Sequence, residues 1–237
     1  MEIKELNILI LYEKKEKENN KDYAYRVLKD NIMTLNLKPG ELVSETELSE
    51  KLGISRTPIR EVLMRLKNEH LIEVKPQTGT YISLIDINMV DQGLFMRYTL
   101  ENEVVNEACN NGLSEDIIME LEKNLFAQKL IANKGDSAIE FHELDKEFHE
   151  LLFKGTNKVD IWNCILNMST HYNRMRLLIE LKHEKQKNIR DHEIYLDLIK
   201  NKSSEGLDEI IKSHIKESTH YWMKIVEEND LMGYLKK

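Results

Sequence analysis

Apolar residues recur at helical spacing along most of the chain, in two stretches that meet near residue 84. In the first stretch the pattern predicts a helix that ends at Leu37-Lys38-Pro39-Gly40, with inward residues Ala24, Val27, Leu28 and Ile32. From about residue 88 the same periodicity predicts helices over 89–111, 115–133, 137–154, 158–183, 186–201 and 204–228. Their short connections are typical of antiparallel neighbours in a helical bundle.

Two short helices with well-marked ends are predicted after the Pro-Gly turn. Ser44 and Glu47 form a capping-box pattern at the start of the first helix. Gly53 ends that helix, because glycine adopts a left-handed conformation at little cost. Ser55 is expected to cap the second helix, and Pro58 falls in its first turn, where a missing amide costs little.

The second of these helices has one apolar face and one basic face. Its inward residues are Ile59, Val62, Leu63 and Leu66, and its outward residues are Arg56, Thr57, Arg60 and Lys67. This is the helix-turn-helix arrangement, in which the second helix enters the major groove and arginines bind guanine or phosphate. Two β-prone runs, 71–74 and 80–83, then predict a hairpin wing with Thr78 and Gly79 at its tip. The alternative is a small helical domain with incidental basic residues.

Composition places the chain among soluble, helix-rich globular proteins, with 32% charged residues and 3 prolines in 237 residues. The apolar run 8–12 is far too short to cross a bilayer, and the start of the chain shows no export signal. Cys109 and Cys164 have no metal-type spacing, so we expect two small core residues in a protein of the reducing cytoplasm.

The net charge of −8 is unevenly distributed. Residues 1–84 hold 14 Lys and Arg and 14 Asp and Glu, so the whole excess of acidic residues lies in the rest of the chain. This difference favours two domains with different roles. A neutral domain can still bind DNA if its basic groups gather on one face.

Four polar residues occupy positions on apolar stripes of the second stretch. Asp145 and His149 lie one helical turn apart, and His192 and His214 lie on the stripes of two later helices. Burial of these groups without partners is costly, and one divalent metal ion satisfies all four. Imidazole nitrogens with one carboxylate suit zinc, nickel or another first-row ion. A single histidine on an apolar stripe is more often a hydrogen-bonded core residue than a metal ligand, and the Asp145–His149 pair alone fits a helix-surface interaction equally well.

The other histidines lack this setting. His171 lies beside the stripe of helix 158–183 and can line a pocket, whereas the surface or a boundary is expected for His70, His142, His183 and His220. Arg97 and Glu101 lie on or beside the inner face of helix 89–111. They form either a buried ion pair that holds the helix, or an effector site in which the guanidinium binds a carboxylate.

The N-terminal motifs resemble the GntR family of winged-helix regulators. The resemblance covers about residues 22–83 and is carried by Leu-Lys-Pro-Gly-Glu-Leu-Val-Ser-Glu at 37–45 and Leu-Gly-Ile-Ser-Arg-Thr-Pro-Ile-Arg-Glu-Val-Leu at 52–63. It implies DNA contacts by Arg56, Arg60 and Gly79, and also by Thr57. His70 stands where the family usually has glycine after the recognition helix, so we expect a small local change there.

The second stretch, over about residues 88–230, is similar to the metal-binding FCD group of FadR-type effector domains. Asp and His one turn apart, followed by two later histidines, match Asp145, His149, His192 and His214. The spacing of Arg97 and Glu101 also resembles the group, and so does Asn157 after Gly155. The resemblance implies a divalent metal ion, zinc or nickel first, and a small organic acid that binds beside or onto it.

Together these features predict a mainly α protein with a flexible extension at 1–21, a winged helix-turn-helix at 22–84 and an all-helical effector and dimerisation domain at 88–230. We expect a cytoplasmic homodimer that represses transcription from a palindromic operator and responds to a small-molecule carboxylate effector. A metal-dependent hydrolase is the main alternative, but no general base or nucleophile accompanies the four ligands. A regulator with a purely structural metal is the other alternative.

Overall fold

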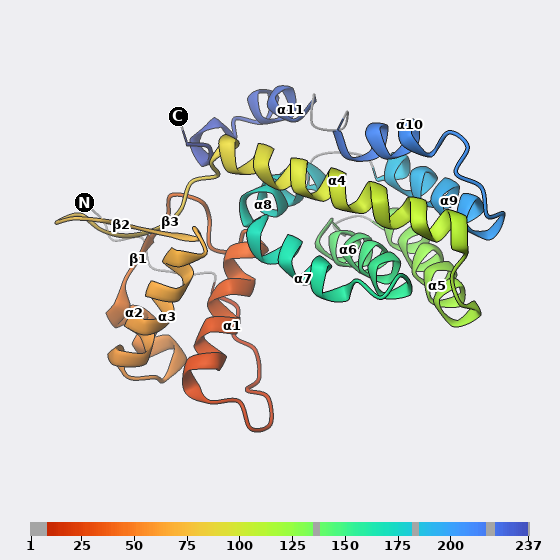
Figure 1. The fold of residues 1–237 in the computed structure, drawn as a ribbon. Coiled ribbons are helices and arrows are strands. Elements are labelled where there is room, and N and C mark those ends of the chain that lie inside the picture. Colours follow the sequence, from red (N-terminus) through yellow and green to blue (C-terminus); the bar gives the residue numbers. More distant parts are fainter. Residues whose placement is uncertain (1–8, 135–137, 182–184, 217–220, 237) are drawn as a thin grey trace. The chain divides into compact units, whose positions relative to one another are not determined.

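The computed structural model describes residues 9–134, 138–181, 185–216 and 221–236 (Figure 1). The chain is mainly helical and divides into two units. Unit 1 contains residues 1–90 together with 170–175 and 231–237, and unit 2 contains residues 91–169 and 176–230. In the part of the chain that is described, no helix is long and apolar enough to span a membrane.

Unit 1 is a winged helix-turn-helix. Its helices are α1 (Asn20–Met33), α2 (Glu45–Leu52) and α3 (Arg56–Asn68), and its strands are β1 (Leu42–Val43), β2 (Ile72–Lys75) and β3 (Gly79–Ile82). The strands form an antiparallel sheet in the order β1-β3-β2 (Figure 1). The sequence predicted the β2–β3 hairpin but not β1, because a strand of two residues is too short to show a period.

The ends of α2 follow the predicted signals, whereas α1 ends at Met33, before the break expected at 37–40. Ser44 accepts a hydrogen bond from the amide of Glu47, and Gly53 ends α2 in the left-handed conformation at φ 65°. Ser55 is the N-cap of α3 by its backbone, but its side chain makes no capping hydrogen bond, so that expectation was wrong. His70 has φ 58°, which explains why glycine suits this position in the family.

The described part of the N-terminal extension packs against α1. Asn31, fully buried in α1, accepts a hydrogen bond from the amide of Ile10 at 2.8 Å and donates one to its carbonyl at 2.9 Å. Arg26 of α1 donates two hydrogen bonds to Glu18, at 2.8 and 2.7 Å. These contacts tie residues 10 and 18 to the helix that follows.

Unit 2 is built from helices around one apolar core. Its elements are α4 (Ile87–Asn111, from residue 91 onward), α5 (Glu115–Ala132), α6 (Ala138–Gly155), α7 (Val159–Met168), α9 (Gln186–Lys200), α10 (Leu207–Ile211), a π-helical segment (Lys212–Lys216) and α11 (Trp222–Glu228). Helix α5 packs against both α6 and α9. Helix α8 (Thr170–Glu180) begins in unit 1 and ends in unit 2, and a 3-10 turn (Met232–Tyr234) lies in unit 1.

Two predicted helices are interrupted in the structure. The helix expected over 158–183 breaks at Ser169, and the next residue, Thr170, donates its hydroxyl to the carbonyl of Glu69. Serine and threonine compete for backbone hydrogen bonds, so they favour such a break without any glycine or proline. The helix expected over 204–228 passes from α-helical to π-helical geometry at Lys212. Cys109 is buried as expected, but Cys164 is exposed, so its assignment to the core was wrong.

The start of α8 is bonded into unit 1. His171 is 3% exposed; its Nε2 lies 3.0 Å from the carbonyl oxygen of His70, and its Nδ1 accepts the amide of Asp86 at 2.9 Å. Arg174 donates to the carbonyl of Ser83 at 2.8 Å. His171 is therefore a hydrogen-bonded core residue of unit 1, in place of the pocket-lining residue that was considered. Burial first, and the charge of Arg174 second, lower its pKa from 6.5 to about 4.

Candidate functional site

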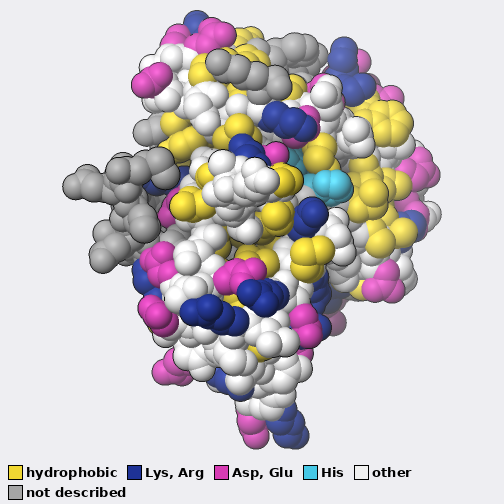
Figure 2. Space-filling model, turned by 90° about the vertical axis from the view of Figure 1, so that its left-hand side faces the viewer, with side chains coloured by type: hydrophobic (Ala, Val, Ile, Leu, Met, Phe, Trp, Pro, Cys, Tyr) yellow, Lys and Arg dark blue, Asp and Glu magenta, His cyan; other side chains and the backbone are white. Residues whose placement is uncertain are grey.

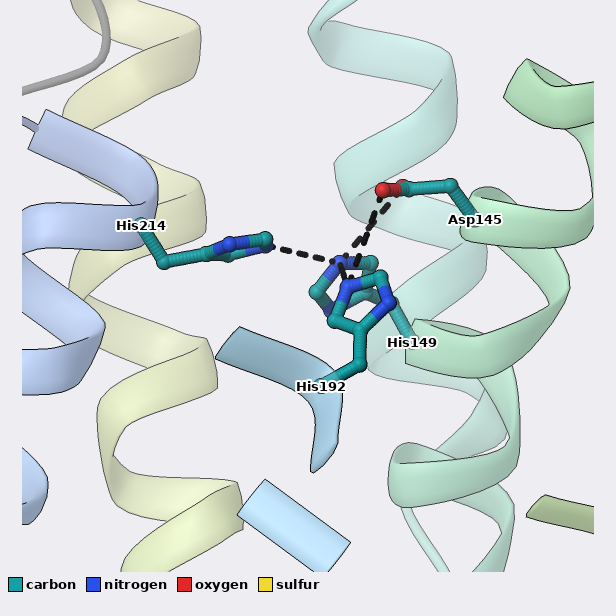
Figure 3. Close-up of side chains that lie close together, drawn as sticks. All are labelled: Asp145, His149, His192 and His214. Carbon is teal, nitrogen blue, oxygen red and sulfur yellow. Dashed lines mark hydrogen bonds and ion pairs between the residues drawn. The ribbon is translucent and has the colours of Figure 1, made fainter. Parts of the chain in front are cut away.

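Four buried side chains of unit 2 meet at one point (Figure 3). Asp145 and His149 come from adjacent turns of α6, His192 comes from the middle of α9, and His214 lies in the π-helical segment. One ligand atom from each lies within 4.8 Å of the others. The first three side chains are 0% exposed and His214 is 7% exposed. The structure thus brings together all four residues that the sequence selected.

The three imidazole rings point the same nitrogen at the centre of this cluster. The Nε2 of His149 lies 3.3 Å from the Nε2 of His192 and 3.3 Å from the Nε2 of His214. The carboxylate of Asp145 lies 3.5 Å from the Nε2 of His149 and 3.6 Å from that of His192 (Figure 3). Three nitrogens and one carboxylate therefore surround a single small volume.

Each Nδ1 atom is turned outward to an acceptor on another element. The Nδ1 of His149 lies 2.8 Å from Glu101 of α4, and the Nδ1 of His214 lies 3.1 Å from Asp191 of α9. A carboxylate can only accept a hydrogen bond when ionised, so the Nδ1 of His214 is the protonated nitrogen. The Nδ1 of His149 makes a close contact with Glu101 without the geometry of a hydrogen bond, and the charge of this carboxylate favours the proton on the same nitrogen. The Nε2 atoms then carry lone pairs directed at the centre.

A chain of amides fixes His192 in the same tautomer. Asn124 donates its amide to the carbonyl of Leu144 and to Glu147, so its oxygen is free to accept from Gln128, at 2.7 Å. The amide of Gln128 is thereby oriented with its oxygen 2.9 Å from the Nδ1 of His192. That nitrogen must donate, and Nε2 of His192 is again the lone-pair atom.

This arrangement fits a divalent cation. Neutral Nε2 atoms 3.3 Å apart cannot hydrogen-bond to one another, and a cation between them satisfies all three at once. Outward Nδ1–H groups held by carboxylates or amides are the usual support of metal-binding histidines. The donor set of three imidazoles and one carboxylate suits zinc, nickel and other first-row ions.

Electrostatics keep the ligands in their metal-binding protonation states. Burial lowers the pKa of His149 to about 4 and that of His192 well below its ordinary value, so both rings are neutral near pH 7. Burial is the largest single effect and would raise the pKa of Asp145, but the neighbouring positive charges, that of Arg176 first, together outweigh it and hold that pKa well below its ordinary range. Asp145 is therefore ionised.

Arg176 belongs to a buried ionic chain beside the cluster. It contacts Asp145 and lies 2.9 Å from Glu180, and Glu180 lies 2.6 Å from the Nδ1 of His142. His142 is 9% exposed, so it is more buried than the surface or boundary position expected for it. His70 is exposed as expected, and His183 and His220 lie outside the described residues.

Arg97 and Glu101 form the buried ion pair that the sequence offered as one of two readings. The guanidinium lies 3.1 Å from the carboxylate, and the two residues are 3% and 0% exposed. Glu101 also faces His149, so it supports the cluster from α4. The role of Arg97 as an effector contact stays a prediction.

The sequence reasoning missed three supporting residues: Gln128, Asp191 and Arg176. A signal for Gln128 was present, because it falls on the buried stripe of α5 with Leu121 and Leu125. Asp191 and Arg176 gave no such signal, since their importance depends on which helix lies opposite them.

The residues selected for DNA binding lie at the surface of unit 1. Arg56, Thr57 and Arg60 are exposed at the start of α3, and Arg60 pairs with Glu45 of α2 at 2.7 Å. Thr78 is exposed in the turn of the hairpin. The surface seen from the left of Figure 1 shows Lys and Arg side chains interspersed with Asp and Glu (Figure 2). The roles of Arg56, Thr57, Arg60 and Thr78 as DNA contacts stay predictions.

Gly79 has a structural requirement of its own. Its φ of 140° is a conformation that other residues rarely adopt, and an added Cβ would lie 2.7 Å from a methyl group of Leu42. The tip of the wing therefore needs glycine even without DNA.

Comparison with known proteins agrees with both units. Residues 20–82 match the family of bacterial regulatory proteins named gntR, and residues 92–217 match the FCD domain. The chain is 28% identical over 206 residues to the HTH-type transcriptional repressor RspR of Escherichia coli, covering 86% of this chain and 90% of that one. It is also 28% identical over 181 residues to the gluconate operon transcriptional repressor of Bacillus licheniformis, covering 74% and 73%.

Among solved structures, E. coli McbR/YncC has the same fold, with a TM-score of 0.72 at 20% identity, over 87% of this chain and 98% of that one. The fold, the two matched domains and the relatives agree. The chain belongs to the GntR family of transcriptional regulators and carries the FCD domain of its FadR-type subfamily.

Proposed function

We propose that this regulator is a repressor whose affinity for its operator is changed by a small carboxylic acid bound at a divalent metal ion. Asp145, His149, His192 and His214 would hold the ion. The observation that carries this proposal is the convergence of three imidazole Nε2 atoms, with that of His149 3.3 Å from each of the other two. The Nδ1 atom of each ring faces an amide or carboxylate oxygen outside the cluster. Repression is supported by the two relatives that are named repressors.

When bound, the ion would supply a positive charge that attracts the carboxylate of an acid. The buried carboxylates and histidines of the chain orient this site and keep it in one protonation state. We expect zinc or nickel and about one ion per chain. Metal analysis of protein purified without chelator tests this part directly.

Unit 1 would read DNA through the exposed start of α3 and the wing. Arg56, Thr57 and Arg60, exposed at the start of α3, would contact base edges or phosphates, and Thr78 and Gly79 would approach the DNA backbone. One recognition helix reads only a few base pairs, so we infer a homodimer on a palindromic operator. The acid can act only by binding one arrangement of that dimer more tightly than the other.

The test is operator binding with and without acids. A fragment from the gene's own upstream region is titrated with zinc-loaded protein, and the dissociation constant is measured with a panel of small carboxylic acids. Coupling of the usual strength predicts that at least one acid changes the dissociation constant by about 5- to 150-fold. The same titration after removal of the metal should lose the response to acid.

Two results would contradict the proposal. Acids that raise the thermal stability of the metal-loaded protein and leave operator affinity unchanged would exclude sensing. A chelator that lowers thermal stability, while no acid raises it, would identify a purely structural ion.

A further inference from the structure

Tyr195 of α9 has a buried hydroxyl beside the histidine cluster, and the described part of the chain offers it no hydrogen-bond acceptor. The side chain is 0% exposed, and among the described residues its Oη has no hydrogen-bond partner. A buried polar group without a partner is costly, and most such groups in native proteins have a ligand, water or functional role. The fold therefore keeps a donor here at the expense of stability.

The position of Tyr195 ties this hydroxyl to the cluster. Its ring centroid lies 5.5 Å from that of His214 and 6.3 Å from that of His192. The charges that act on its hydroxyl are those of Glu101, Arg97, Asp191 and Asp145. The three carboxylates among them contact the imidazoles of the cluster. The unused donor is thus in the same buried region as the converging Nε2 atoms.

Charge in this region restricts the partner of the hydroxyl. Three carboxylates act on it against one guanidinium, that of Arg97, so the surroundings of the hydroxyl are negative on balance and a further anionic group is disfavoured there. A neutral hydroxyl or carbonyl oxygen can accept the hydrogen bond without repulsion. An acid whose carboxylate is at the metal satisfies Tyr195 when an adjacent carbon carries such an oxygen.

We propose that Tyr195 is a specificity-determining residue that donates its hydroxyl hydrogen to a neutral oxygen of the effector, and that the effector is a 2-hydroxy or 2-oxo monocarboxylic acid. This inference rests on the proposed acid-sensing function and narrows its ligand class. It concerns recognition of the effector only.

The test compares acids that differ by one hydroxyl. Glycolate and acetate, and lactate and propionate, are titrated calorimetrically into the zinc-loaded wild type and the Tyr195→Phe variant. Tyr221→Phe, the same change at a side chain 66% exposed, is the control. The hydroxyl of the acid can itself favour binding to the metal in every protein. The informative quantity is therefore the dissociation constant of the acid without the hydroxyl divided by that of its hydroxy acid, compared between each variant and the wild type.

Loss of one neutral hydrogen bond predicts that this ratio falls by about 2- to 12-fold in Tyr195→Phe and stays unchanged in Tyr221→Phe. Acetate and propionate should bind both variants as they bind the wild type. Tyr195→Phe should also melt no lower than the wild type without ligand, because it removes an unsatisfied group. A ratio unchanged by Tyr195→Phe, with acids still bound, overturns this inference alone. If neither member of a pair binds the zinc-loaded wild type, both the sensing proposal and this inference fail.

Discussion

Replacement of Gln128 by methionine tests whether the supporting residues hold the metal ligands. Gln128 lies on α5, outside the cluster, and its oxygen accepts from the Nδ1 of His192 at 2.9 Å. Methionine fills a similar volume without an acceptor. The buried Nδ1–H then loses its partner, at a cost of about 1–3 kcal/mol in the stability of the metal-free protein.

The larger effect is expected on metal affinity. A histidine that no longer has its Nδ1 held can rotate or change tautomer, and loss of such support typically lowers metal affinity 10- to 100-fold. This corresponds to about 1.4–2.8 kcal/mol. Gln128→Glu keeps an acceptor for His192 but loses the donor to Asn124, so its zinc affinity should lie between those of Gln128→Met and the wild type.

The assay is competition for zinc between the protein and a chelator of known affinity, together with urea unfolding of the metal-free forms. Lys129→Met is a matched control, because it changes the next residue of α5 to methionine at a side chain 46% exposed. If Gln128→Met folds as the wild type does and binds zinc within about twofold of it, the role assigned to Gln128 is wrong.

Three further predictions concern other parts of the chain. Arg60→Ala should abolish retardation of the operator fragment, whereas the exposed Lys200→Ala of unit 2 should not; equal binding by Arg60→Ala would contradict the recognition face. Burial first, and Arg174 second, lower the pKa of His171 from 6.5 to about 4. The contribution of this neutral imidazole to the free energy of unfolding is therefore present in full above pH 6.5 and is lost as the pH falls toward 4. That loss amounts to about 3 kcal/mol at most. In His171→Gln the free energy of unfolding should therefore fall less steeply than in the wild type between pH 6.5 and 4. Equal slopes in urea unfolding of the two proteins would contradict this role of His171. Iodoacetamide should label the exposed Cys164 and spare Cys109, where burial raises the pKa to about 11, so mass spectrometry of native protein should find one adduct, on Cys164.

The sequence predicted those features that depend on local spacing. The cap at Ser44, the end of α2 at Gly53 and the positions of Asp145 and His149 one turn apart all follow from residues close together in the chain. His192 and His214 were found because histidine on an apolar stripe is anomalous wherever it occurs.

The features that were missed depend on contacts between distant segments. The break at Ser169 is accompanied by a bond from Thr170 to Glu69, 101 residues away, and periodicity carries no trace of it. Cys164 lies in an apolar helix, but its side chain is exposed. In so short an apolar helix, periodicity does not define which face is buried to within one residue, so it does not show whether Cys164 is buried or exposed. Sequence placed Glu101 correctly on an inner face, but only the structure shows that it faces His149.

Anomalous diffraction from crystals grown with zinc is the most direct test of the central claim, which is that the four side chains of Figure 3 hold one divalent ion. The account predicts one anomalous peak per chain, bonded to the Nε2 atoms of His149, His192 and His214 and to the carboxylate of Asp145. No peak at this point, or a peak bonded through Nδ1 atoms after the rings have turned, would contradict it.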